Sequence, residues 1–210
     1  MSALFPVSEF AKVKKMLHIY GWGQKILLTK LDIIHQDFEN FHNNNPIENI
    51  RSRMKAPESI AQKLAKQGHE LTAENAQKYI MDIAGIRIIC TFAKDIYFLA
   101  EIIRSMPHTI IISEKDYVSN PKPSGYRGYH FAMEIPVYFS GKIENVPVEI
   151  QLRTAAMDFW ATLEHKVKYK YEEHIPQHLS DELVFCAEKI AELDGRMFTI
   201  HDMISLLNSN

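Results

Sequence analysis

Apolar side chains recur at helical spacing in two long segments, one near each end of the chain. In residues 8–44 steps of four and three predict a helix with one apolar stripe, at Leu27, Leu31, Ile34, Phe38 and Phe41. Residues 21–23 (Gly-Trp-Gly) predict a break or kink near its start. In residues 179–208 the same alternation runs from Leu183 to Leu207. This heptad seam fits either a helix docked on its own domain or an interface between subunits, and the 27–41 stripe is a natural partner for it, within or between chains.

The middle of the chain alternates between strand and helix patterns. β-Branched and apolar runs predict strands over residues 85–92, 109–113, 131–139 and 146–153. Helical spacing predicts helices over residues 57–68, 72–80, 94–105 and 154–171, with Pro57 at a first position and Thr154 as a cap. This order indicates an α/β (α+β) fold, a mixed β-sheet flanked by helices, with a long helix at each end.

Composition narrows the class of protein. Of 210 residues, 46% are hydrophobic, and 24 Lys+Arg against 26 Asp+Glu give a net charge of −2. This balance argues against a generalised nucleic-acid coat, so no obligate nucleic-acid partner is expected, but a local phosphate site remains possible. Without a secretory signal or an apolar run of about 20 residues, we expect a soluble cytoplasmic protein with no membrane partner. Cys90 and Cys186 lie in apolar surroundings and are expected to be buried thiols.

Basic residues concentrate after the first long helix. Arg51, Arg53, Lys55, Lys63 and Lys66 fall within sixteen residues. We predict that Arg53 and Lys55 lie in a loop leading into a helix N-terminus, where guanidinium, ammonium and backbone N–H groups suit phosphates. A solvated basic surface is the alternative.

An acid and an arginine accompany the strand over residues 85–92. Asp82 comes just before this strand, and Arg87 projects from the face opposite Ile86 and Ile88. A charged residue in such a strand must be paired or must line a cleft. Asp82 could form a structural salt bridge with Arg87, or it could bind Mg²⁺, which prefers carboxylate oxygens and substrate phosphates.

A long basic and aromatic loop covers residues 115–130. Tyr126 could stack on a base, while Lys122, Arg127 and His130 could meet phosphates. Long ordered loops of this kind are often functional. The alternative is an ordinary hairpin loop with surface tyrosines.

Polar and apolar residues alternate in the strand over residues 146–153. Glu149, Gln151 and Arg153 share one face, and the opposite face belongs to the core. Either this polar face is the solvent-facing edge of an antiparallel sheet, or Glu149 is a metal ligand or a general base.

The helix predicted over residues 154–171 has two distinct faces. Its spacing gives a polar face of Asp158, Thr162 and His165 and a core stripe of Trp160, Leu163 and Val167. Beyond it, His174 and His178 are four residues apart, but the intervening Pro176 argues against a zinc pair on a regular helix.

Six blocks, in this order, resemble the synthetase domain of the RelA/SpoT homology family, in its short form called small alarmone synthetase. They are Arg53-x-Lys55 with Lys63, Asp82-Ile-Ala-Gly-Ile-Arg87, Lys115-Asp-Tyr, Pro121-Lys-Pro-Ser-Gly-Tyr-Arg-Gly-Tyr-His130, Glu149-Ile-Gln151-Leu-Arg-Thr and Met157-Asp-Phe-Trp-Ala-Thr-Leu-Glu-His165. The resemblance implies a nucleotidyltransferase-like fold. It also implies a single synthetase domain over residues 1–210, with a core of about 45–172 and the helices 8–44 and 179–208 as oligomerisation elements.

Members of this family transfer the pyrophosphate of ATP to the 3′-hydroxyl of GDP or GTP, giving AMP and ppGpp or pppGpp. The resemblance therefore implies a GTP pyrophosphokinase with Mg²⁺ as cofactor and homotetrameric self-association. The chain length implies an enzyme that makes the alarmone without a domain that degrades it. A non-catalytic nucleotide- or RNA-binding regulator on the same scaffold is the alternative, and a structural oligomerisation protein is a third interpretation.

Roles are implied for four ATP-binding positions and for one catalytic Mg²⁺ ligand, all of which match the family motifs. Arg53 and Arg87 would stack about the adenine, and Lys55 and Lys63 would hold the phosphates. Asp82 would bind Mg²⁺.

The remaining implied roles concern the acceptor nucleotide. Glu149 would activate the 3′-hydroxyl and also approach the metal. The implied contacts with GDP or GTP are Tyr126 on guanine, Lys122 and His130 near the phosphates, Gln151 as a positioning group, and Asp158. Related sequences can carry Asn in place of Asp158, and no preference between GDP and GTP follows from residues 113–116.

Overall fold

Five strands form one mixed sheet in the computed structural model, which describes residues 4–42, 44–170 and 175–207. The strands are β1 (Ile47–Met54), β2 (Ala84–Cys90), β3 (Ile110–Asp116), β4 (Tyr129–Phe139) and β5 (Lys142–Thr154). Their order across the sheet is β1-β2-β5-β4-β3. β2 and β5 run parallel, while the other neighbouring pairs are antiparallel. The predicted mixed sheet is confirmed.

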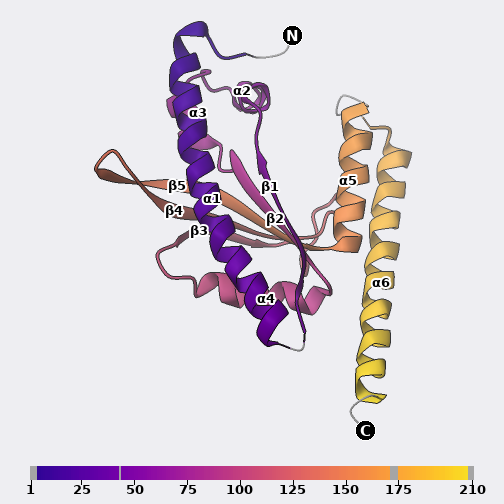
Figure 1. The fold of residues 1–210 in the computed structure, drawn as a ribbon. Coiled ribbons are helices and arrows are strands. Elements are labelled where there is room, and N and C mark those ends of the chain that lie inside the picture. The colour runs from indigo at the N-terminus through magenta and orange to yellow at the C-terminus, as the bar shows by residue number, and fades with distance from the viewer. Residues whose placement is uncertain (1–3, 43, 171–174, 208–210) are drawn as a thin grey trace.

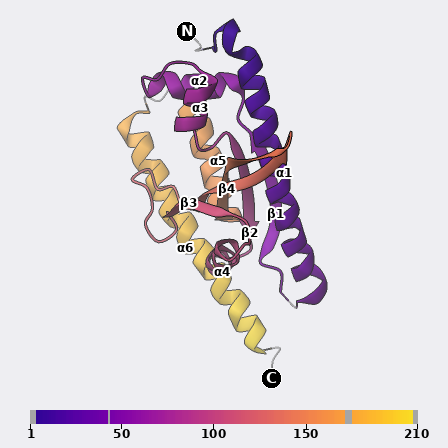
Figure 2. The same cartoon turned by 90° about the vertical axis from the view of Figure 1, so that its left-hand side faces the viewer.

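Helices cover both faces of this sheet. They are α1 (Phe10–Phe41), α2 (Pro57–Lys66), α3 (Ala73–Tyr79), α4 (Ala93–Arg104), α5 (Ala155–Lys170) and α6 (Gln177–Leu207). Figure 1 shows α1 crossing one side of the sheet, with α5 and α6 side by side on the other. The turned view in Figure 2 again places α1 and α6 on opposite sides. The predicted helices agree with these bounds to within a few residues at each end.

The core lies between the sheet and the helices α1 and α4. Strands β2 and β5 contribute Ile86, Ile88, Ile150 and Leu152, which pack against Leu27 and Leu31 of α1 and Ile96 and Leu99 of α4. Burial of such side chains is the main favourable term in folding. The apolar stripe predicted in the first long helix therefore packs on the sheet of its own chain.

Helix α1 runs without interruption through Gly21, Trp22 and Gly23. The predicted break is wrong because Gly23 serves a packing contact instead. A Cβ atom at Gly23 would lie 3.1 Å from the Cβ of Val146. The missing side chain thus lets α1 approach β5 closely.

The segment containing Arg51 and Arg53 is strand β1, and the prediction of a loop there is wrong. β1 pairs antiparallel with β2 at the edge of the sheet, with Arg53 opposite Gly85. Its side chains are mostly exposed, so the segment lacks the apolar alternation by which strands are recognised. Only Lys55 of the predicted pair lies in the connection to α2.

Helix α6 and the 27–41 stripe do not pair within the chain. Leu183 and Ile190 pack against a small cluster near α5, but Leu193, Met197, Ile200, Ile204 and Leu207 are exposed. Cys90 is buried as expected, whereas Cys186 is exposed on α6, so the prediction for this thiol is wrong. In α5, Trp160 is buried but Leu163 is 42% exposed, so the core stripe predicted there is only partly correct. His174 lies outside the described residues.

Within the described residues, no helix combines the length and the apolar character needed to cross a membrane.

Candidate active site

One row of polar residues crosses all five strands on the face turned away from α1. The register aligns Arg51 with Arg87, Arg87 with Gln151, Gln151 with His130, and His130 with Lys115. Residues directly opposite each other on neighbouring strands project to the same face. β5 lies at the centre of the sheet, so the alternative of a solvent-facing edge strand is wrong.

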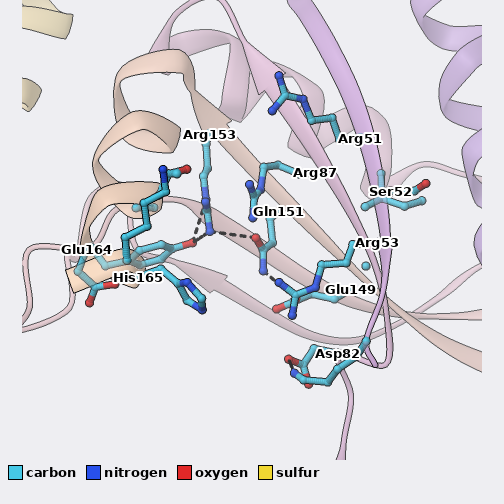
Figure 3. A pocket seen from close by; sticks show the side chains of 17 residues that line it. Arg51, Ser52, Arg53, Asp82, Arg87, Glu149, Gln151, Arg153, Glu164 and His165 are labelled. Atoms are coloured by element: carbon cyan, nitrogen blue, oxygen red, sulfur yellow. Dashed lines mark hydrogen bonds and ion pairs between the residues drawn. The ribbon is translucent and has the colours of Figure 1, made fainter. Parts of the chain in front are cut away.

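A cleft of about 660 Å³ lies over this row, within the range that small-molecule sites occupy. Figure 3 shows its wall and floor, with side chains entering from β1, β2, β5 and α5. Seven of the eleven predicted site residues line it: Arg53, Lys55, Asp82, Arg87, Tyr126, Glu149 and Gln151. Each of the other four contacts one of these seven: Lys63, Lys122, His130 and Asp158. The structure therefore brings the whole predicted set together.

Two lysines hold the carboxylate of Asp82. Lys55 Nζ forms a short ion pair with Oδ2, and Lys63 Nζ lies 2.8 Å from Oδ1. Burial opposes ionisation of Asp82, but the hydrogen bonds from the two ammonium groups outweigh it and lower the pKa. The predicted salt bridge between Asp82 and Arg87 does not form, because Arg87 pairs with Asp158 instead.

Glu149 is held on the cleft floor by two neighbours in the same cross-strand layer. His130 Nδ1 lies 3.1 Å from Oε1, and Gln151 Nε2 donates to Oε2 at 2.8 Å. Burial raises the pKa of Glu149, but the contacts with His130 and Gln151 outweigh it, so the net shift is downward. Glu149 is therefore ionised at neutral pH, as a general base must be.

Asp158 joins two arginines at the start of α5. Its Oδ1 atom lies 2.9 Å from Arg87 Nη1 and 3.0 Å from Arg153 Nη1. Burial and then the charge of Arg153 lower the pKa of Arg87. In the described part of the chain, Arg87 Nε is the buried side-chain atom left without a hydrogen-bond partner. This unpaired donor in a cleft wall is suited to a ligand.

Tyr126 belongs to a second, small apolar cluster on the cleft side of the sheet. Its partners are Trp160 and Ala161 of α5 and Ala187 of α6. Gly125 fits directly beneath α6, because a Cβ atom there would lie 2.7 Å from the Cβ of Ala187. The cluster therefore anchors the loop that carries Tyr126 to the two C-terminal helices.

The ammonium group of Lys122 lies over two aromatic rings, those of Tyr117 and Tyr126. Its Nζ atom is 4.5 Å from the ring centre of Tyr117 and 4.9 Å from that of Tyr126. Such cation–π contacts are worth about 0.5–1 kcal/mol at exposed sites. Lys122 contacts the predicted stacking residue without lining the cleft itself.

Two residues of the site received no role from the sequence. Alternation predicts Arg153 on the polar face of β5, and the structure buries it among Tyr126, Gln151 and Asp158. Gln24 of α1 donates to the backbone carbonyls of Arg53 and Gly85, at 3.0 and 2.9 Å, and so ties β1 to β2 beneath the cleft. The sequence contains one sign of this role: Gln24 is a polar residue three positions before Leu27, on the same helix face as the apolar stripe.

The carboxylates of Asp82 and Glu149 are the donor set that fits a divalent cation. Gly85 pairs with Glu149 across parallel strands, and Asp82 precedes Gly85 by three residues. The two carboxylates are close enough for the charge of Asp82 to oppose the ionisation of Glu149. The described residues contain no group of three or more potential ligands, and Mg²⁺ bound between substrate phosphates and one or two carboxylates does not require one.

Comparison with known proteins agrees with this geometry. Residues 52–174 match the family described as the region found in RelA / SpoT proteins. The chain is 44% identical over 187 residues to the GTP pyrophosphokinase YwaC of Bacillus subtilis, covering 89% of each protein. It is 35% identical over 190 residues to the GTP pyrophosphokinase YjbM of the same organism, covering 89% of this chain and 87% of YjbM.

A solved structure extends the likeness to three dimensions. The small alarmone synthetase 1 of Bacillus subtilis, bound to its product pppGpp, superposes with a TM-score of 0.84 at 32% identity, covering 91% of this chain and 97% of that one. Sequence and fold thus match over about nine tenths of the chain. The chain belongs to the RelA/SpoT homology family, among the small alarmone synthetases.

Proposed function

We propose that this protein is a GTP pyrophosphokinase that transfers the pyrophosphate of ATP to the 3′-hydroxyl of GDP or GTP, giving AMP and ppGpp or pppGpp. One observation carries the proposal: Glu149, with a hydrogen-bond partner on each carboxylate oxygen, lies on the floor of a cleft walled by arginines and lysines. The similarity to two GTP pyrophosphokinases and to a product-bound alarmone synthetase supports it. A cytoplasmic location is part of the proposal, because ATP and guanine nucleotides are abundant there.

The donor half of the cleft suits a nucleoside triphosphate. Arg53 and Arg87 present guanidinium planes, which stack on an adenine. Lys55 and Lys63, now paired with Asp82, supply the ammonium groups for the phosphates. When ATP binds, these lysines would exchange their carboxylate partner for phosphate oxygens, which frees Asp82.

The acceptor half suits a guanine nucleotide. The ring of Tyr126 stacks on the base, and Lys122 and His130 lie toward its phosphates. Gln151 and Asp158 position the acceptor from β5 and α5. Glu149 accepts the proton of the 3′-hydroxyl as its oxygen attacks the β-phosphorus of ATP and the bond to the α-phosphate oxygen breaks, which releases AMP.

Magnesium completes the proposed site. Asp82, together with Glu149, would hold Mg²⁺ against the substrate phosphates, where the ion would neutralise charge on the transferred group. The residues of the chain do the rest: the lysines neutralise phosphate charge, and the stacking groups align donor and acceptor.

Turnover by the purified protein tests the proposal. We expect AMP and a 3′-pyrophosphorylated nucleotide in equal amounts when ATP and Mg²⁺ are supplied with GDP or GTP, and a comparison with GMP defines the acceptor range.

Glu149→Gln keeps the size of the side chain and removes the base, so kcat should fall by about 10²–10⁴-fold while ATP still binds. Glu144→Gln on the same strand, whose carboxylate pairs with Lys142 away from the cleft, should retain turnover. A folded wild-type protein that forms neither product would contradict the proposal, and tight RNA binding in that case would favour a regulator.

Self-association as a homotetramer is a second part of the proposal. Leu193, Met197, Ile200 and Ile204 form an exposed apolar stripe along α6, each more than half exposed. A stripe of this kind is typical of a surface covered by another subunit. Light scattering should give the mass of four chains, and Ile200→Glu should lower it, whereas Lys189→Glu on the polar side of α6 should not. A monomer at micromolar concentration would contradict this part.

A further inference from the structure

Arg153 is buried at the inner end of the cleft, with every nitrogen engaged. Its Nε and Nη2 atoms donate to the hydroxyl oxygen of Tyr126 at 3.1 and 2.8 Å. Nη2 also donates to Gln151 Oε1 at 2.9 Å, and Nη1 to Asp158 Oδ1 at 3.0 Å. Its side chain is only 7% exposed, too enclosed to offer a free guanidinium face to a substrate.

The contacts of Arg153 fix the direction of the hydrogen bonds around it. A guanidinium group has only donors. The Tyr126 oxygen therefore accepts from Arg153 with both lone pairs, and its single proton must point elsewhere. The acceptor within reach is His130 Nε2, at 2.5 Å.

The tautomer of His130 follows from that direction. Because Nε2 accepts from Tyr126, it carries no proton, and in the neutral ring the proton lies on Nδ1. Nδ1 faces Glu149 Oε1 at 3.1 Å. His130 thus donates from Nδ1 to the carboxylate, and its ring is oriented by Tyr126.

A second chain of hydrogen bonds reaches the other carboxylate oxygen. Arg153 donates to Gln151 Oε1, which turns the amide nitrogen of Gln151 toward Glu149. That nitrogen donates to Oε2 at 2.8 Å. Figure 3 shows Arg153, Gln151 and Glu149 in line, joined by dashed contacts.

We propose that Arg153 is a positioning residue that orients the base Glu149 through two hydrogen-bond chains, one through Tyr126 and His130 and one through Gln151. Its importance for turnover rests on the proposed function, whereas the chains themselves do not. Each carboxylate oxygen of Glu149 has one partner that fixes its direction: Nδ1 of His130 contacts Oε1, and Nε2 of Gln151 donates to Oε2. The charge of Arg153 is compensated by Asp158.

Two variants separate the chains from simple loss of structure. Tyr126→Phe keeps the ring for stacking and removes the hydroxyl, which breaks one chain. Arg153→Lys keeps the charge but cannot donate in three directions from a planar fork, which breaks both. A small misplacement of a catalytic group can cost about 10²-fold in rate. We expect kcat to fall about 10-fold in the first variant and about 10²-fold in the second, with KM for ATP unchanged in both.

Non-additivity is the signature of a shared chain. The double variant Tyr126→Phe/Arg153→Lys should lose no more activity than Arg153→Lys alone, since both substitutions interrupt the same connection. A merely structural role for Arg153 would give losses that add and would move the melting temperature together with kcat. Additive losses would overturn the proposal.

The tautomer of His130 can be measured by NMR, which tests the hydrogen-bond chains without relying on turnover. Long-range ¹⁵N–¹H spectra of the whole protein, assigned with His130→Gln, should show the Nδ1–H form in the wild type and a mixture of tautomers in Tyr126→Phe. Tyr117→Phe is the matched control, because its ring also contacts His130, at 5.4 Å between centroids, and it should leave the Nδ1–H form intact. An Nε2–H form in the wild type would overturn the hydrogen-bond chains. Absence of AMP formation with the expected tautomer would overturn only the proposed function.

Discussion

The two faces of the central sheet are made by alternate residues of the same strands, and they differ in nearly every physical respect. On the α1 side, Ile86 and Ile88 of β2 are almost completely buried in an apolar core. On the cleft side, Arg87 lies between them in sequence and contacts Asp158 of α5. Apolar contacts are non-directional, whereas each polar group on the other face depends on a specific partner.

This difference separates stability from chemistry in one small fold. The apolar core on the α1 face tolerates changes that conserve volume, because its contacts have no required direction, with Gln24 as the polar exception. The cleft face has little apolar area of its own, and it is closed by the small cluster of Tyr126, Trp160, Ala161 and Ala187. A substitution on the α1 side should therefore affect the free energy of unfolding, and one on the cleft side should affect turnover.

The largest expected effect is on the α1 side. Leu27 is completely buried between α1 and the sheet, and Leu27→Ala should lower the free energy of unfolding by about 2–5 kcal/mol. Turnover per folded molecule should not change, because Leu27 is on the far side of the sheet from the cleft. Urea titration and steady-state kinetics measure the two quantities. Ile33→Ala, at a position of α1 that is 61% exposed, should stay within about 0.5 kcal/mol. A loss of kcat in folded Leu27→Ala would break the distinction between the faces.

Asp82→Asn tests the cleft side. It removes the negative charge that Lys55 and Lys63 now share, together with one of the two proposed Mg²⁺ ligands. We expect turnover to fall by on the order of 10²-fold and the Mg²⁺ concentration needed for half-maximal rate to rise. Asp37→Asn, which removes an exposed carboxylate paired with His42 on α1, should change neither. Equal activity of Asp82→Asn and wild type would show that the carboxylate has no part in the reaction.

Most of the fold could be predicted from periodicity, and the exceptions have tertiary causes. The stripes in α1 and α6 step identically, yet Leu31 is buried under its own sheet while Met197 is exposed. What covers a stripe depends on where the chain places its other elements, and spacing along one helix contains no information about that. Strand β1 was missed for a related reason, because an edge strand with polar residues on both faces resembles a loop in sequence.

The candidate site, like the fold, could be predicted from the sequence only in part. Alternation along β5 correctly predicted that Glu149, Gln151 and Arg153 share a face. It could not predict that Asp158 pairs with Arg87, since these residues are 71 positions apart (158 − 87) and meet only through the sheet. The role of Arg153 was also hidden, because its partners come from a loop, a strand and a helix that the sequence does not place relative to one another.

A smaller effect, on the KM for the guanine nucleotide, should appear where the loop that carries Tyr126 meets α6. Gly125 has φ +86°, and an added Cβ would lie 2.7 Å from that of Ala187. Gly125→Ala should displace the loop of Tyr126 and raise KM for the guanine nucleotide about 10-fold, with KM for ATP unchanged. Gly141→Ala is the matched control, because its φ is also positive (+77°) but its Cβ would meet nothing within 4 Å.

Relief of the contact sharpens this test. Adding Ala187→Gly to Gly125→Ala removes the close approach but keeps the backbone strain, so the double variant should recover part of the loss in guanine-nucleotide affinity. If Gly125→Ala instead raised KM for ATP and for the acceptor equally, the small cluster would support the whole cleft rather than its acceptor half.

The smallest expected effect lies where α6 meets the end of β5. Thr154 Oγ1 donates to Asp194 Oδ2 at 2.7 Å, and burial, only partly opposed by this bond, raises the pKa of Asp194. A carboxyl whose pKa is raised on folding contributes stability at low pH, which is lost as pH rises through the folded value. Asp194→Asn keeps an acceptor for Thr154 and removes the charge, so it should slightly stabilise the protein at pH 7. The gain in stability should vanish below the ordinary pKa of aspartate, where the wild-type carboxyl is also neutral.

Melting temperatures at pH 7 and pH 3.5 measure this gain, and kcat should stay at the wild-type value. If Asp194→Asn were less stable than the wild type at pH 7, the charge of Asp194 would be what holds α6. The cleft side, unlike the α1 side, would then depend on electrostatics for its stability as well as for its chemistry.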